Sequence, residues 1–69
     1  MSITIMPGDL FREPLTGTLF LPLDYFDGEV SGTWLDATLW PFDVGVFSAD
    51  AFERMLAPTD MNFKDLTAS

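Results

Sequence analysis

The chain has 69 residues, a size at which the burial of apolar surface leaves only about 3–5 kcal/mol over the loss of chain entropy. Because 48% of its residues are hydrophobic, it should fold, as one domain (residues 1–69). Because its net charge is -8, it should repel nucleic acids and anionic membranes. The absence of Cys and His excludes disulfides, thiolate metal sites and the usual hydrolytic triads.

Export and membrane insertion both require apolar runs that this sequence lacks. Residues 1–10, MSITIMPGDL, have no basic region followed by a hydrophobic stretch, and nothing approaches the roughly 20 apolar residues of a membrane helix. We therefore expect a soluble protein that remains in the cytoplasm.

The first two predicted elements are a short strand and a connection. Residues 2–6 alternate polar and apolar side chains and end at a Pro-Gly turn signal, which is typical of a strand. Residues 9–14 have no clean period and end at a proline, so we expect a connection with Leu10 and Phe11 turned inward.

A β-hairpin is predicted around Asp27-Gly28, because this dipeptide tolerates the positive φ angles of a two-residue turn. Residues 15–25 precede it with a period of two, as in a half-buried strand. Pairing across the turn places Leu21 opposite Trp34 on an apolar face.

The same register predicts three further features of the hairpin. It places Phe20 and Phe26 on the polar face. The apolar parity changes within residues 32–35, which indicates a β-bulge there. Pro22 cannot donate to a ladder, so the strand that begins at Leu15 should be an edge strand, or it should break or bulge at Pro22. An edge strand there could pair with its copy in a homodimer.

The C-terminal half predicts a third strand and one helix. Apolar residues alternate from Phe42 to Val46, with Asp43 on the outer face, and the spacing becomes helical between residues 48 and 58. The expected fold is α+β: an antiparallel sheet of three to four strands with one short amphipathic helix near the C-terminus. Residues 59–69 fit either an extended segment or another helical turn.

The sequence contains no catalytic or cofactor signature. Paired carboxylates could act as acid and base, but they need a cleft that so small a domain rarely provides, so we expect neither an enzyme nor a cofactor. A calcium-binding domain is a minor alternative. Aligning Gly28 with the glycine of an EF-hand loop puts Leu23, Tyr25 and Trp34 at ligand positions, so we assign no metal ligands.

Negative charge is concentrated in the middle of the chain. No Lys or Arg occurs between Glu13 and Glu53, although this segment is rich in acids. Like charge raises the free energy of the compact state, and a basic partner would relieve that repulsion. Simple solubility is the alternative explanation of the charge. The residues that we expect to bind a partner are Asp24, Phe26, Asp27, Glu29, Asp36 and Asp43.

In size, net charge, lack of Cys and His, and α+β pattern, the chain resembles the small acidic DNA-mimicking inhibitors of phages and mobile elements, anti-CRISPR proteins among them. The resemblance lies in composition and not in an alignable motif, so it transfers no binding residue. It implies a non-enzymatic inhibitor in the host cytoplasm that binds a DNA-binding protein, such as a CRISPR effector subunit, where that subunit contacts target DNA or the protospacer-adjacent motif. The inhibitor itself would bind neither nucleic acid nor membrane. The alternative is a small acidic adaptor or assembly protein, whose partner takes Phe20, Phe26 or the helix.

Overall fold

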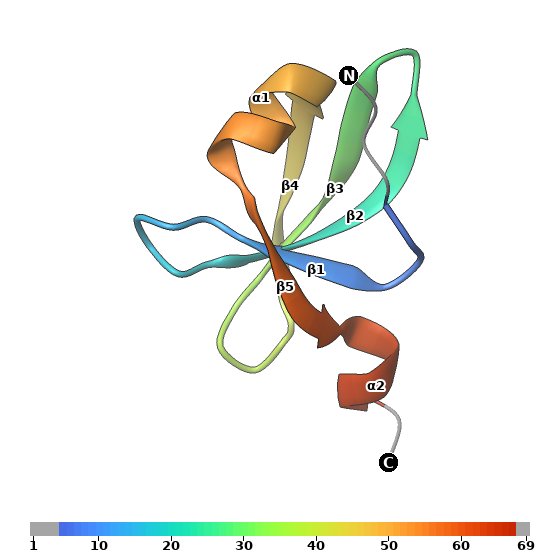
Figure 1. Ribbon diagram of the computed structural model, residues 1–69. Helices are drawn as coiled ribbons and strands as arrows, with labels where there is room; N and C mark the ends of the chain where they lie inside the picture. The colour runs from blue at the N-terminus through green and yellow to red at the C-terminus, as the bar shows by residue number, and fades with distance from the viewer. Residues whose placement is uncertain (1–4, 68–69) are drawn as a thin grey trace.

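A computed structural model describes residues 5–67, which form a five-stranded antiparallel sheet and two short helices (Figure 1). The strands lie in the order β4-β3-β2-β1-β5. The α+β prediction is confirmed, with one strand and one helix more than expected. None of the helices in this part of the chain is long and apolar enough to cross a membrane. The elements are β1 (Asp9–Arg12), β2 (Leu19–Phe26), β3 (Glu29–Leu35), β4 (Pro41–Ser48), α1 (Ala49–Met55), β5 (Ala57–Asn62) and α2 (Phe63–Thr67).

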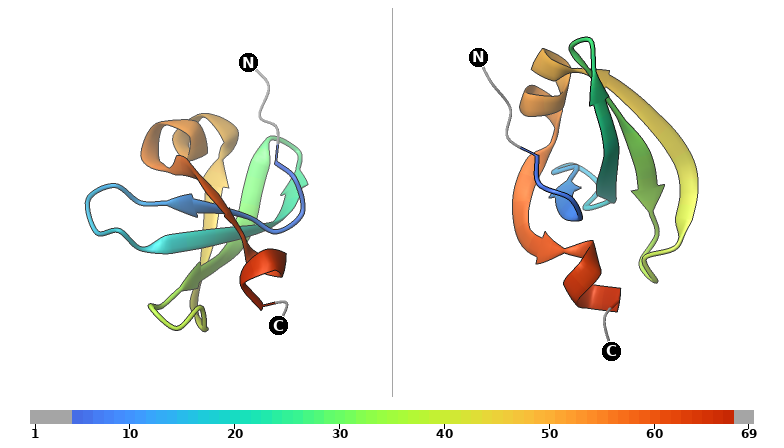
Figure 2. Two further views of the ribbon diagram at one scale, coloured as in Figure 1. Left: turned by 60° about the horizontal axis from the view of Figure 1, so that its bottom comes forward. Right: turned by 90° about the vertical axis from the view of Figure 1, so that its right-hand side faces the viewer.

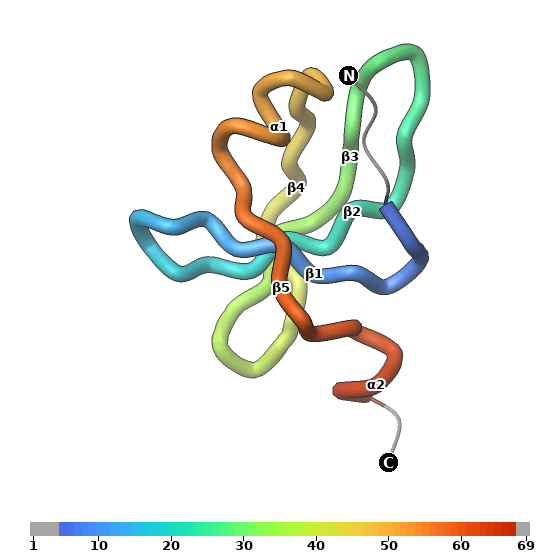
Figure 3. Tube along the Cα trace, viewed as in Figure 1, coloured from blue at the N-terminus to red at the C-terminus, as the bar shows by residue number. Residues whose placement is uncertain are grey.

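The sheet is strongly curved, so that β1 and β5 cross the direction of β3 and β4 (Figure 2). The Cα trace shows three loops that leave the centre in different directions (Figure 3). The β2–β3 turn lies at the same end as α1, the β3–β4 loop lies at the opposite end, and the β1–β2 loop extends to the side. Acids that share the β2–β4 segment are therefore divided between two ends.

The N-terminal predictions are corrected in one part. Residues 2–4 of the predicted first strand lie outside the described residues, and Ile5 and Met6 are not in a strand. The segment expected to be a connection contains β1, which pairs with β2 on one side and with β5 on the other. Leu10 and Phe11 are both buried, as predicted. Neighbouring residues of a strand point to opposite faces, so both faces of β1 are covered, and this explains the missing alternation.

The predicted turn at Asp27-Gly28 is confirmed, with φ angles of 54° and 75°. The expected irregularity also exists, but β3 is continuous and the extra residues lie on its partner strands. Leu23 is unpaired between Pro22 and Asp24, because the register of β2 shifts there. A second shift leaves Phe42 unpaired on β4. Both bulges occur where a proline is at or next to the irregularity, since proline has no N–H to donate.

The bulge on β2 reverses the predicted faces of that strand. Phe20, and not Leu21, lies opposite Trp34. The side chain of Phe20 is 0% exposed, so its predicted place on the polar face is wrong. Phe26 lies beyond the bulge next to the turn and is 76% exposed, as the prediction for that residue requires.

The strand predicted to begin at Leu15 begins later, and of the alternatives at Pro22 the bulge is confirmed by the register shift between Pro22 and Asp24. Leu15 lies in the exposed β1–β2 loop, and β2 begins four residues later, between β3 and β1. The edges of the sheet are β4 and β5. β1 pairs with Leu19 and Phe20 only, so a homodimer through the rest of β2, residues 21–26, stays a prediction.

The faces of β4 are opposite to those predicted. Phe42, Val44 and Val46 are exposed, whereas Gly45 is buried. A Cβ at Gly45 would lie 2.7 Å from the ring of Phe20. The space beside this glycine is thus filled by a core aromatic side chain, and this packing outweighs the apolar alternation along β4.

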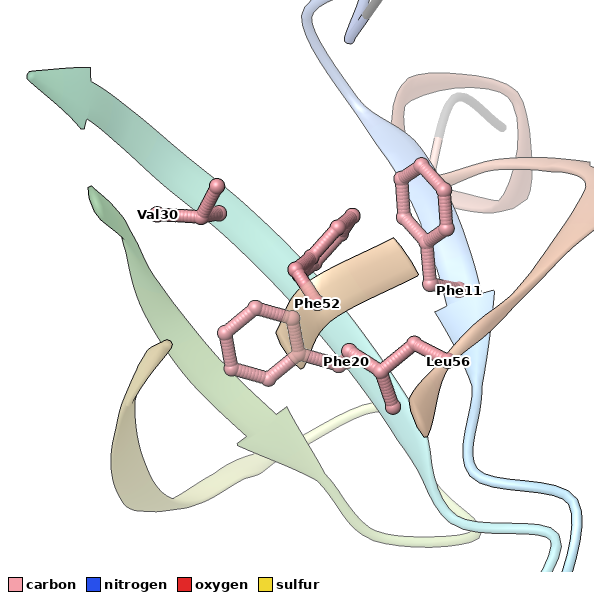
Figure 4. Close-up of a cluster of buried hydrophobic side chains, with 5 residues drawn as sticks. All are labelled: Phe11, Phe20, Val30, Phe52 and Leu56. Atoms are coloured by element: carbon pink, nitrogen blue, oxygen red, sulfur yellow. The ribbon is translucent and has the colours of Figure 1, made fainter. Parts of the chain in front are cut away.

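The core consists of two clusters on opposite sides of the β1–β2 pair. The first gathers under α1, with Phe20 at its centre (Figure 4), and contains Phe11, Phe20, Val30, Phe52 and Leu56. The second contains Leu10, Leu21 and Leu35, with Met61 and Phe63 packed against it. The predicted helix is confirmed as α1, whose N-cap Ser48 accepts a hydrogen bond from the N–H of Ala51 (3.2 Å). Residues 59–67 combine both alternatives: the strand β5 is followed by one helical turn, α2.

Gly32 is the residue of β3 that permits the close approach of β2 at the bulge. A Cβ at this position would overlap the carbonyl oxygen of Leu21 and the Cα of Pro22, which are backbone atoms and cannot rotate away. We expect Gly32→Ala to lower the free energy of unfolding by about 1–3 kcal/mol. Urea unfolding followed by tryptophan fluorescence measures this loss. The neighbouring control Ser31→Ala should change the midpoint little; equal losses in the two variants would contradict the register.

Candidate functional site

The first group of candidate residues surrounds the β2–β3 turn and is called the tip here: Asp24, Phe26, Asp27 and Glu29. All four are exposed. Phe26 pairs with Glu29, and Asp24 lies two residues before Phe26 on the same face of β2. The structure therefore brings together four of the six residues that the sequence analysis selected, with the aromatic ring among the carboxylates.

Helix α1 adds an acid to this end of the molecule. Ser48 pairs with Glu29, and the next N–H, that of Ala49, donates a hydrogen bond to the carbonyl of Gly28 (2.8 Å). Asp50 follows in the first turn of α1 and is exposed. Sequence reasoning missed Asp50 as a neighbour of the tip. The Ser48 cap was the available signal, because it ends β4 and starts α1 beside the turn.

Asp36 and Asp43 do not join the tip. Trp34, the pairing partner of Asp43, is five residues along β3 from Glu29, or roughly 17 Å at the rise of a strand. Asp43 is exposed, but its predicted outward orientation is wrong, because the register places it on the side of β4 shared by Gly45 and Phe47. These two acids belong to the opposite end.

Asp36 organises the β3–β4 loop through its carboxylate. Its Oδ1 accepts hydrogen bonds from the N–H and hydroxyl of Thr38 (2.9 and 2.6 Å) and from the N–H of Trp40 (3.0 Å). These bonds favour the charged form and lower the pKa of Asp36 below its ordinary value of 3.8, with the Thr38 hydroxyl as the largest cause. Asp36 thus has a structural role, although it is also exposed.

A groove lies at the same end, between the β1–β2 loop and the paired ends of β3 and β4. Its volume is about 320 Å³. A second hollow, which contains Asp36 in its wall, adjoins it and shares Thr16, Thr18 and Phe42. We call the first hollow the loop-end groove. It is lined by Glu13, Thr16, Thr18, Trp34, Phe42 and Asp43.

The basic residues lie outside the central strands. Arg12 is in β1, Arg54 in the last turn of α1 and Lys64 in α2. The strands β2, β3 and β4 contain acidic residues but no Lys or Arg. Between residues 5 and 67, no group of three or more His, Cys, Asp or Glu side chains is arranged to hold a metal ion. The charged side chains of β2, β3 and β4 are therefore all negative.

Comparison with protein families, curated proteins and solved structures gives no match.

The lowered pKa of Asp36 makes the β3–β4 loop sensitive to acid. The hydrogen bonds to its carboxylate contribute stability above the ordinary carboxyl pKa, and that contribution is lost as the pH falls through the lowered value. We expect Asp36→Ala to be less stable than the parent at pH 7, and the gap to narrow at pH 3 and below. The difference is measured from the urea unfolding midpoints of the two proteins between pH 7 and pH 3. Thr38→Val, which removes one of the three donors, should differ less from the parent than Asp36→Ala does. A gap independent of pH would contradict the role of the carboxylate.

Proposed function

We propose that the protein is a non-catalytic inhibitor that binds the nucleic-acid-binding surface of a basic protein and occupies it as a DNA mimic. The observation that carries this proposal is the tip: three exposed acids surround one tight turn on strands that contain no base. These carboxylates are attached to a hydrogen-bonded hairpin and not to a flexible tail. The backbone that carries them is therefore ordered before binding, which lowers the entropic cost of contact with Lys and Arg.

A surface that binds nucleic acid suits such a tip because it is built to neutralise closely spaced charge. Duplex DNA carries one negative charge per about 1.7 Å of helix axis, and proteins meet it with clusters of Lys and Arg. A CRISPR effector subunit, which contacts target DNA and its protospacer-adjacent motif in this way, is the partner class suggested by the resemblance in size and charge. An inhibitor of that class would act in the cytoplasm of the host cell.

A small acidic adaptor is the second candidate, and the exposed apolar side chains of the outer face favour it. Val44 is 74% exposed and Val46 60% exposed. In the register, Val46 pairs with Ser31 and Ser31 pairs with Asp24, which lies two pairs away from Phe26 on the same face. For an adaptor, Phe26→Ala should reduce binding more than the loss of any single acid does; for a DNA mimic, the loss of tip acids should cost more.

The proposal is tested by capture and displacement. The immobilised protein is incubated at low salt with a nuclease-treated bacterial lysate, and bound proteins are quantified by mass spectrometry before and after a wash with a 30-base-pair duplex. The DNA mimic predicts that DNA-binding proteins are enriched and that the duplex displaces them. Retention of the bound proteins in excess duplex would contradict it.

A further inference from the structure

The loop-end groove combines two aromatic walls with an acidic rim. Trp34 packs edge-to-face against Phe20 and Phe47, with ring centroids 5.0 and 5.9 Å away, so its indole is fixed by the core. It remains half-buried where it lines the groove. Phe42 is the bulged residue of β4 and is 58% exposed. The bulge therefore places an aromatic ring in the wall of the groove.

The acids of the rim are held in place through one oxygen each. Oε2 of Glu13 accepts hydrogen bonds from the N–H and hydroxyl of Thr16 (2.7 and 3.1 Å). Oδ1 of Asp43 accepts the N–H of Val44 (2.8 Å). These hydrogen bonds leave Oε1 of Glu13 and Oδ2 of Asp43 as the oxygens best placed to bind a ligand.

We propose that the loop-end groove binds an arginine side chain of the partner. A guanidinium group is planar, stacks on aromatic rings and offers five N–H donors, which suits a groove lined by Trp34 and Phe42 together with the acids Glu13 and Asp43. An anion would be repelled by the acidic rim, and an aliphatic side chain would give Oε1 of Glu13 and Oδ2 of Asp43 no positively charged partner. This inference rests on the proposed basic partner, but it assigns Asp43 a contact at the end opposite the tip.

The test uses NMR titration with a pentapeptide that has arginine at its centre and glycine elsewhere, capped at both ends. Matched peptides carry citrulline, which has the same shape without the charge, or lysine. The probe is the indole N–H signal of Trp34, assigned with a Trp40→Phe variant. We expect a saturable shift of this signal with a dissociation constant at least about fivefold lower for arginine than for citrulline, as a cation–π contact requires. Equal affinity for citrulline, or equal or tighter binding of lysine, would overturn the arginine assignment.

Two variants locate the contact, and a third serves as the matched control. Phe42→Leu keeps an apolar side chain without the ring, and Asp43→Asn removes the charge while its amide oxygen can still accept the N–H of Val44. Both should weaken binding of the arginine peptide several-fold, whereas Asp60→Asn, at an exposed acid of β5 outside the groove and the tip, should not. Unchanged binding in both groove variants would overturn the proposal. The outcome is separate from that of the capture experiment, because the tip can bind a basic surface while the groove does not.

Discussion

Replacing Phe20 with alanine is expected to leave the protein largely unfolded at 25 °C. The side chain is 0% exposed, and its ring lies within 5.0–6.1 Å of those of Trp34, Phe47 and Phe52, measured between centroids. Removal of a buried phenylalanine costs about 3–5 kcal/mol through lost burial and the remaining cavity. A domain of this size has about that much stability in total.

The matched control is Phe26→Ala, on the same strand but 76% exposed, which should change the free energy of unfolding by less than about 0.5 kcal/mol. Far-ultraviolet circular dichroism and thermal melts of the two variants measure the difference. A cooperative melt of Phe20→Ala close to that of the parent would contradict the observed register of β2. It would support the predicted one, in which both phenylalanines lie on the polar face.

Reversing the charge of the tip is expected to reduce partner binding by roughly two orders of magnitude, because like charges placed together in an interface cost several kcal/mol. The variant combines Asp24→Lys and Glu29→Lys with Asp27→Asn. Asparagine is chosen at position 27 because the residue has a φ of 54°, a conformation that asparagine adopts more readily than lysine. The partner isolated by capture is titrated with parent and variant by calorimetry.

A control variant with the same change in net charge at other positions distinguishes the effect of the tip from the effect of net charge. Asp60→Lys and Asp65→Lys with Glu53→Gln alter acids of β5, α2 and α1. If the tip is the contact, this control should retain most of the affinity, with a loss limited to slower association. Equal losses in both variants would show that only the overall charge matters. Retained folding of each is checked by circular dichroism.

The parts of the fold that the sequence predicted are those with local chemical signals. The dipeptide Asp27-Gly28 predicted the turn because both residues adopt positive φ angles. Ser48 as a cap and the helical spacing of the apolar residues predicted α1. The corrected parts depend on contacts distant in sequence. The face of β4 is set by the Phe20 ring beside Gly45, and β1 forms because β2 and β5 cover its two edges. Neither fact is visible in a local pattern.

The candidate site divides in the same way. The tip was predictable, because one turn joins all its residues. The loop-end groove was not, because Glu13, Trp34 and Phe42 meet only when the β1–β2 loop lies beside the end of β3 and a bulge exposes the phenylalanine. These aromatic and acidic residues lie in different elements, so no regular spacing in the sequence groups them.

We propose that the carboxylates of the tip occupy a surface of the partner that otherwise binds DNA. The most direct test measures the affinity of the protein for its captured partner with and without a saturating DNA duplex. The salt concentration is varied from about 50 to about 300 mM, a range over which contacts of phosphate type weaken strongly. A DNA mimic predicts that affinity falls steeply with salt and that the duplex and the protein exclude each other. Binding that is insensitive to salt, or a ternary complex with DNA, would contradict it.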